Sequence, residues 1–117
     1  MKRILLVEDE ILISLNSSML LEDEGFAVDV AFNGEQGLDL ALARSPDLIV
    51  TDYMMPRMDG LTFIMEARAR GVTVPILLTT SMPEKGLSET YRGGHDAYLA
   101  KPYNAEQLLA LVRRLLG

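Results

Sequence analysis

The chain alternates between short, continuous apolar runs and longer segments in which apolar residues recur every three or four positions. The continuous runs are typical of strands that are buried on both faces of a sheet. They lie at residues 4–7, 48–50, 76–78 and, more weakly, 97–99. Residues 26–32 (F-A-V-D-V-A-F) alternate instead, which favours a half-exposed strand nearer the sheet edge.

Four segments between these runs show helical periodicity. Their periodic residues are Leu12, Leu15 and Met19; Leu38, Ala41 and Leu42; Leu61, Ile64 and Arg68; and Leu108, Leu111, Val112 and Leu115. Gly25 and Gly71 are typical helix terminators. Asn104 and Gln107 have the spacing of a capping box at the start of the last helix. Residues 83–92 show only a weak helical pattern.

The predicted order is strand then helix, five times over. This order predicts an α/β fold, a doubly wound five-stranded parallel sheet with helices on both faces. With 117 residues and no linker or repeat, we expect one domain over residues 1–117. Ligands of such sheets bind outside the carboxyl ends of the strands.

Composition excludes several classes of protein. A hydrophobic share of 49% and a charged share of 24% are ordinary for a globular protein and argue against disorder or a coiled coil. The absence of cysteine excludes disulfides, thiolate zinc sites and cysteine nucleophiles. With 11 basic and 17 acidic residues, the net charge of −6 argues against direct nucleic-acid binding. No apolar run approaches the roughly 18 residues of a membrane span, so we expect a cytoplasmic protein.

Charged and hydroxyl side chains stand at the carboxyl ends of the predicted strands. They are Glu8 and Asp9 after the first, Asp52 after the third, Thr79, Thr80 and Ser81 after the fourth, and Lys101 after the fifth. Close carboxylates repel each other by on the order of 1 kcal/mol or more per pair. A hard divalent cation such as Mg²⁺ relieves that repulsion. Three carboxylates, one Mg²⁺ and Lys101 sum to zero charge.

Such a neutral site suits phosphoryl transfer, which needs mainly positioning and charge stabilisation on the phosphoryl oxygens. The metal, a lysine ammonium and a threonine hydroxyl would each serve one oxygen. Asp52 is the best candidate nucleophile because it ends a central apolar strand and because aspartate forms acyl phosphates.

The sequence resembles the receiver domain of bacterial two-component response regulators over essentially its whole length. The matching pieces are L-L-V-E-D-E at the start, D-Y-M-M-P-R-M-D-G around Asp52, P-I-L-L-T-T after the third helix and D-A-Y-L-A-K-P near the end. No single piece is decisive, but four in order on the expected strands are highly specific. The resemblance implies the flavodoxin-like strand order 2-1-3-4-5.

The resemblance also implies a role for each acidic residue. Asp52 matches the phosphoacceptor, which takes a phosphoryl group from a sensor histidine kinase or a histidine phosphotransfer protein. Asp9 matches a direct Mg²⁺ ligand, and Glu8 matches the neighbouring acid that acts through water. The backbone carbonyl of Met54 matches the main-chain metal ligand.

Three further residues match the switching machinery of the family. Thr80, five residues after Pro75, matches the switch hydroxyl, and Lys101 matches the lysine that contacts the phosphoryl group. The bond between Lys101 and Pro102 is expected to be cis. Tyr98 matches the aromatic residue that swings inward, which alters the surface of the fourth helix, fifth strand and fifth helix.

The resemblance leaves the partners open. The expected output is contact with a downstream protein, or with an output domain that is missing from this chain, and a weak dimer on phosphorylation is compatible with it. Met54 and Met82 offer no group to orient an attacking water. They therefore predict a comparatively long-lived phosphoryl state.

Three alternative functions compete with signalling. A Mg²⁺-dependent phosphohydrolase of the haloacid dehalogenase type needs an aspartate two residues after its nucleophile, where this chain has Met54. We therefore predict a switch rather than a turnover enzyme. A nucleotide-binding fold would want glycines where Glu8, Asp9 and Glu10 stand. A receiver-like binding module without phosphorylation is disfavoured by the retained Asp52 and Lys101.

Overall fold

The sheet of the protein has five parallel strands in the order β2-β1-β3-β4-β5. The computed structural model describes residues 1–81 and 94–117. The strands are β1 (Arg3–Val7), β2 (Ala27–Ala31), β3 (Leu48–Asp52), β4 (Ile76–Thr80) and β5 (Ala97–Ala100). The predicted doubly wound sheet and its strand order are confirmed, with the alternating strand at an edge and the strand that ends in Asp52 at the centre.

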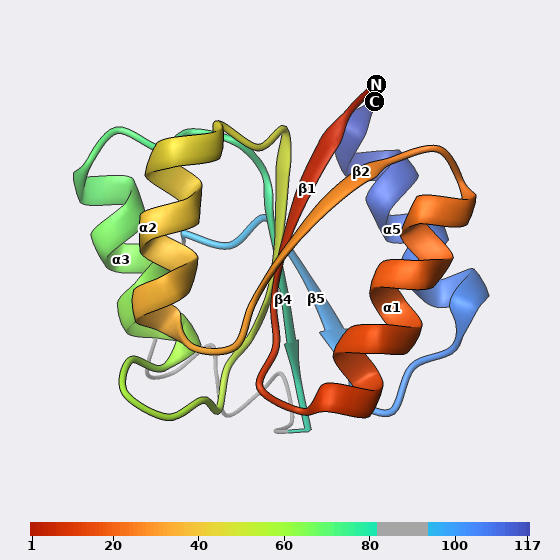
Figure 1. Ribbon diagram of the computed structural model, residues 1–117, viewed down its shortest axis with the longest axis horizontal. Coiled ribbons are helices and arrows are strands. Elements are labelled where there is room, and N and C mark those ends of the chain that lie inside the picture. The colour runs from red at the N-terminus through yellow and green to blue at the C-terminus, as the bar shows by residue number, and fades with distance from the viewer. Residues whose placement is uncertain (82–93) are drawn as a thin grey trace.

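Helices cover both faces of this sheet. They are α1 (Ile11–Asp23), α2 (Gly34–Arg44), α3 (Gly60–Ala69) and α5 (Ala105–Leu116). Figure 1 shows α1 and α5 on one face and α2 and α3 on the other. The weakly predicted helix at residues 83–92 lies outside the described residues, as does Met82.

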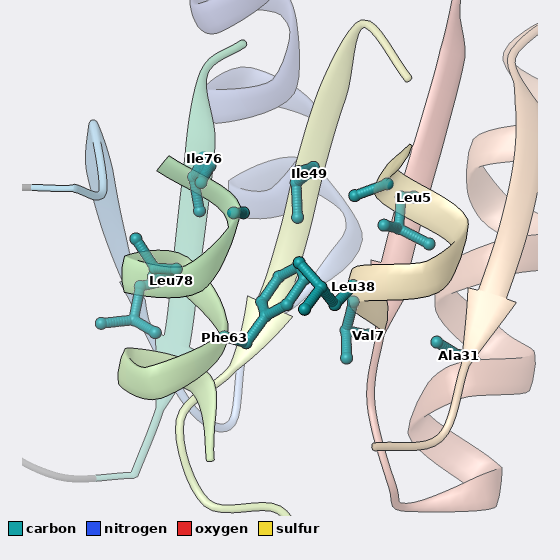
Figure 2. Close-up of a cluster of buried hydrophobic side chains, with 11 residues drawn as sticks. Leu5, Val7, Ala31, Leu38, Ile49, Phe63, Ile76 and Leu78 are labelled. Atoms are coloured by element: carbon teal, nitrogen blue, oxygen red, sulfur yellow. The ribbon is translucent and has the colours of Figure 1, made fainter. Parts of the chain in front are cut away.

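Each face of the sheet buries its own apolar cluster, because successive side chains of a strand point to opposite faces. Under α2 and α3, Phe63 packs among side chains of β1, β3 and β4, as Figure 2 shows. Under α1 and α5, the other set of strand residues packs with Leu108 and Val112. The central strands are therefore apolar on both sides, as the continuous runs predicted.

Helix α1 buries a different face from the one that its periodic residues suggested. Leu12, Leu15 and Met19 are 74%, 51% and 53% exposed, whereas Ser14 and Ser17 are buried. Apolar residues occur all round this helix, so periodicity alone does not identify the buried side. Small serines let the helix approach the sheet closely, and Leu21, which is wholly buried, anchors it.

Local interactions define the starts of two further helices and the last loop. Asn104 and Gln107 form the predicted capping box of α5. The Asp59 side chain accepts a hydrogen bond from Thr62 N–H and so caps α3. The Lys101–Pro102 peptide bond is cis, as the resemblance implied.

Candidate functional site

Three charged side chains converge at the carboxyl ends of β1, β3 and β5. Leu6, Val50 and Leu99 point to the face of the sheet that α1 and α5 cover. Because side chains alternate between faces along a strand, the residue two positions further on points to the same face. Those residues are Glu8, Asp52 and Lys101. The pleat of three separate strands therefore brings two acids and one base to one place.

Lys101 bridges the two buried acids. Its Nζ lies 2.7 Å from Glu8 Oε1 and 3.0 Å from Asp52 Oδ2. Glu8 and Asp52 are only 1% and 4% exposed. The peptide N–H groups of Glu10 and Tyr53 donate to the carboxylates of Glu8 and Asp52, at 3.1 Å and 2.8 Å respectively. The acids are thus held by fixed donors as well as by the lysine.

Burial dominates the proton affinity of this cluster. It raises the pKa of Glu8 to about 7, against the lowering effect of the Lys101 hydrogen bond. It also raises the pKa of Asp52, again opposed by Lys101. Burial lowers the pKa of Lys101, but its hydrogen bonds to the two acids outweigh burial and leave that pKa above its usual value. When both are ionised, the two buried carboxylates carry more negative charge than one lysine compensates.

A divalent cation fits this excess of negative charge. Glu8, Asp9 and Asp52 each offer a carboxylate oxygen, and these oxygens lie within 4.8 Å of one another. Ionised, they carry three negative charges against the single positive charge of Lys101. Asp9 and Asp52 also line, with Met54 and Lys101, an open cleft of about 450 Å³. Oxygen donors beside an open cleft, which leaves room for water ligands, are the surroundings that Mg²⁺ prefers.

The loop between β3 and α3 packs tightly against Asp52. Gly60 N–H donates to Tyr53 O at 2.7 Å, and a Cβ at Gly60 would lie 2.1 Å from Asp52 O. Only a glycine fits so close to that carbonyl. No role for Gly60 was predicted from the sequence, although the D-G pair that ends the motif around Asp52 was its signal.

Thr80 and Tyr98 lie on the other face of the sheet from Lys101. Thr80 follows Leu78 by two positions on β4, and Tyr98 pairs with Leu78 in the register of β4 with β5. Thr80 is wholly buried and Tyr98 is partly buried against the α2 and α3 cluster. Lys101 N–H donates to Thr80 O at 2.9 Å, so the two predicted site residues are adjacent at the strand ends.

A further contact beside the site was not predicted from the sequence. The hydroxyl groups of Tyr103 and Ser17 are hydrogen bonded at 2.8 Å, which joins the loop after Lys101 to α1. Burial raises the pKa of Tyr103, with the Ser17 hydrogen bond opposing it. Ser17 belongs to the buried face of α1 that periodicity missed, so no pattern in the sequence signalled this contact.

Comparison with known proteins agrees with the fold. The family model for the response regulator receiver domain matches residues 4–113. The chain belongs to the response regulator receiver domain family. It is 38% identical over 117 residues to the transcriptional regulatory protein DltR of Streptococcus agalactiae, covering 95% of this chain and 50% of the relative. The chain thus spans about half the length of such relatives.

Two solved receiver structures are also similar over nearly their whole length. The chemotaxis protein CheY4 of Vibrio cholerae is 32% identical with a TM-score of 0.91, covering 98% of each chain. The receiver domain of the sensor histidine kinase PA1611 from Pseudomonas aeruginosa is 31% identical with a TM-score of 0.90, covering 99% of this chain and 98% of that one. That structure has a magnesium ion coordinated in its active site cleft.

As a receiver domain of a two-component system, this chain has a phosphoryl-accepting signalling function. None of the helices in the described parts of the chain combines the length and apolar character that crossing a bilayer requires.

Proposed function

We propose that Asp52 is the phosphoacceptor of a Mg²⁺-dependent switch whose single domain spans residues 1–117. The observation that supports this most strongly is the position of Lys101 Nζ, 3.0 Å from Asp52 and 2.7 Å from Glu8, in a cluster that Asp9 completes. A structural ion pair would need one acid for one base. When they are ionised, three acids beside one lysine leave negative charge that a further cation offsets.

The proposed step is an in-line displacement at phosphorus. A carboxylate oxygen of Asp52 attacks the phosphorus of a phosphohistidine on a kinase or phosphotransfer protein. The bond between phosphorus and the imidazole nitrogen breaks, its electron pair stays on the nitrogen, and that nitrogen takes up a proton. The product is an aspartyl phosphate, and little chemistry is needed beyond positioning and charge stabilisation.

The residues of this chain have separate roles in this step. Asp9, Asp52 and the backbone carbonyl of Met54 would hold Mg²⁺, with Glu8 acting through a water molecule. When bound, the ion supplies positive charge to one phosphoryl oxygen. The Lys101 ammonium would supply a second positive contact to the phosphoryl group, because it already lies beside the attacking carboxylate. The Tyr53 N–H fixes the orientation of that carboxylate.

We further propose that Thr80 and Tyr98 carry the signal. A phosphoryl group on Asp52 projects beyond the strand ends, where groups from both faces of the sheet reach it. The Thr80 hydroxyl would bond to a phosphoryl oxygen, and Tyr98 would fill the space that it leaves. Because Thr80 is buried and Tyr98 shares its face, a move of one changes the packing of the other. The effect is a population shift between two packings.

The proposed partners follow from this chemistry. A sensor histidine kinase or histidine phosphotransfer protein donates the phosphoryl group. The output goes to a downstream protein or to an output domain, through the surface that β5 and α5 share with the predicted fourth helix. We place the protein in the cytoplasm. Turnover of phosphate esters is disfavoured because Met54, 61% exposed beside the site, offers no acid or base.

Incubation with phosphoramidate and Mg²⁺, followed by intact-mass measurement, tests the proposal. We expect one added phosphoryl group in the wild-type chain and none in Asp52→Asn or after metal removal with a chelator. Asp39→Asn, which alters an exposed acid of α2, is the matched control and should be phosphorylated normally. Phosphorylation of Asp52→Asn at the wild-type rate would contradict the assignment.

A further inference from the structure

The loop between β5 and α5 is fastened at both of its ends. At its start, Lys101 N–H donates to Thr80 O at 2.9 Å, which ties the lysine backbone to β4. At its end, Asn104 forms the capping box that begins α5. Between these two points, the Tyr103 hydroxyl reaches across to Ser17 of α1 at 2.8 Å.

The Tyr103 contact differs from the other two in what it connects. α1 begins at Ile11, immediately after the segment that carries Glu8 and Asp9. The hydrogen bond between Tyr103 and Ser17 therefore links the segment that supplies the acids to the segment that supplies the lysine. Together with the ion pair between Lys101 and Glu8, at 2.7 Å, it closes a ring through both segments.

We infer that Tyr103 and Ser17 are positioning residues that hold the Lys101 loop against α1 and so keep the lysine ammonium aimed at the phosphoryl position beside Asp52. This inference rests on the proposed function. A lysine side chain has many rotamers, so its reach depends on where its backbone is held. Ser17 is 4% exposed, so breaking this bond would leave a mostly buried hydroxyl without its partner.

Ser17 and Tyr103 also border a small cavity beside the site. Ser17, Lys101 and Tyr103 line a space of about 140 Å³ together with Ile13 and Asn16 of α1. Without the hydrogen bond, the loop is free to shift across this space, and the lysine would shift with it.

Tyr103→Phe tests the inference because it keeps the ring in the apolar cluster under α1 and α5 and removes only the hydroxyl. With phosphoramidate at saturating Mg²⁺, we expect the rate of Asp52 phosphorylation to fall about two- to tenfold, the equivalent of one neutral hydrogen bond. Ser17→Ala should have the same effect, and the double variant should be no slower than either. The Mg²⁺ concentration that gives half the maximal rate should be unchanged.

Ser18→Ala is the matched control, because the Ser18 hydroxyl donates only within α1, to Leu15 O. Its rate should equal that of the wild type. A second set of variants, made in the Lys101→Ala background, distinguishes a positioning role of Tyr103 from a general effect on stability. In Lys101→Ala, adding Tyr103→Phe should change the rate no further, since the lysine through which it acts is absent.

The outcomes separate the two proposals. An unphosphorylated wild-type chain would overturn the proposed function and this inference with it. A phosphorylated wild type with equal rates in Tyr103→Phe, or a Tyr103→Phe effect that persists in the Lys101→Ala background, would overturn this inference alone.

Discussion

The carboxylate of Asp52 is held in place by the residue that follows it in the sequence and by Lys101, which comes from the end of a distant strand. The Tyr53 N–H donates to Oδ1 at 2.8 Å, and Lys101 approaches Oδ2 at 3.0 Å. The two oxygens therefore have different surroundings. Behind them, the Asp52 carbonyl packs against the backbone of Gly60, where no side chain fits.

Gly60→Ala should damage both stability and phosphorylation. The added Cβ would lie 2.1 Å from Asp52 O, so the end of β3 or the start of α3 must move. We expect a loss of about 1–3 kcal/mol in the free energy of unfolding, as for other overpacked positions. Urea unfolding measures that loss, and intact mass after phosphoramidate treatment should show slower phosphorylation.

Gly25→Ala provides the control for Gly60→Ala. Gly25 has a φ of +94° and open space around it, so alanine there is strained by about 1 kcal/mol without touching the site. The two variants should lose comparable stability, but only Gly60→Ala should phosphorylate slowly. Equal phosphorylation rates in both would show that Gly60 acts on stability alone.

Among the elements, α1 shows how weakly an apolar pattern identifies the buried face of a helix. Its exposed side carries Leu12, Leu15 and Met19, and its buried side carries Ser14, Ser17 and Leu21. The buried serines permit close approach to the sheet, and one of them bonds to Tyr103. The face that a pattern search assigns to the core is the face that contributes least to it.

Substitutions on the two sides of α1 should therefore have very different effects. Leu15 is 51% exposed and Leu21 is wholly buried. We expect Leu15→Gln to change the free energy of unfolding by less than about 0.5 kcal/mol, and Leu21→Ala to lower it by about 3 kcal/mol. Urea denaturation of both variants measures the difference. A loss above about 1 kcal/mol for Leu15→Gln would contradict the exposed position of that side chain.

A second element, α3, is anchored by a residue that resembles part of an apolar stripe. Arg68 shares the spacing of Leu61 and Ile64, but its guanidinium donates to the carbonyls of Val72, Val74 and Gly94 and pairs with Asp96 at 3.1 Å. The end of α3 is thereby tied to the segments that lead into β4 and β5. The apolar stem of arginine packs while its charged head bonds, so a helical pattern accommodates it.

In the molecule as a whole, the carboxyl edge of the sheet concentrates negative charge. The overall net charge is −6, and two of the acids are buried around one lysine. Burial makes the ionised form of Glu8 unfavourable and raises its pKa from 4.5 to about 7. The folded chain therefore binds a proton at Glu8 that the unfolded chain has already released.

Metal-free protein should consequently become less stable as pH rises from 5 to 8. A carboxyl group whose folded pKa lies above its unfolded value stabilises the fold below the unfolded value and loses that contribution as pH passes the folded pKa, here about 7. The loss for Glu8 is on the order of 3 kcal/mol at most. Thermal unfolding at several pH values measures it.

Mg²⁺ and Glu8→Gln are the controls for this pH dependence. The ion binds ionised carboxylates, so it should raise the unfolding temperature most at pH 8 and least at pH 5. Glu8→Gln cannot ionise at this position and should flatten the metal-free profile. Metal-free wild-type protein that is more stable at pH 8 than at pH 5 would contradict the raised pKa of Glu8.

Much of this molecule was predictable because local pattern and chain order are sequence properties. Continuous apolar runs identify strands that are covered on both faces, and alternation with helices allows few arrangements other than a parallel sheet. Since parallel strands end at one edge, the residues that follow them converge there. Glu8, Asp52 and Lys101 were therefore predicted as neighbours, and the structure brings them within ion-pair distance.

The sequence by itself determined the strands, their end residues and the family. Only the tertiary structure decided which side of α1 is buried, how closely Gly60 approaches Asp52 and that Tyr103 bonds to Ser17. These facts depend on how far apart two elements pack, and packing distance is set by many side chains from both partners together. The pattern of residues in one segment does not specify which residues of another segment will pack against it.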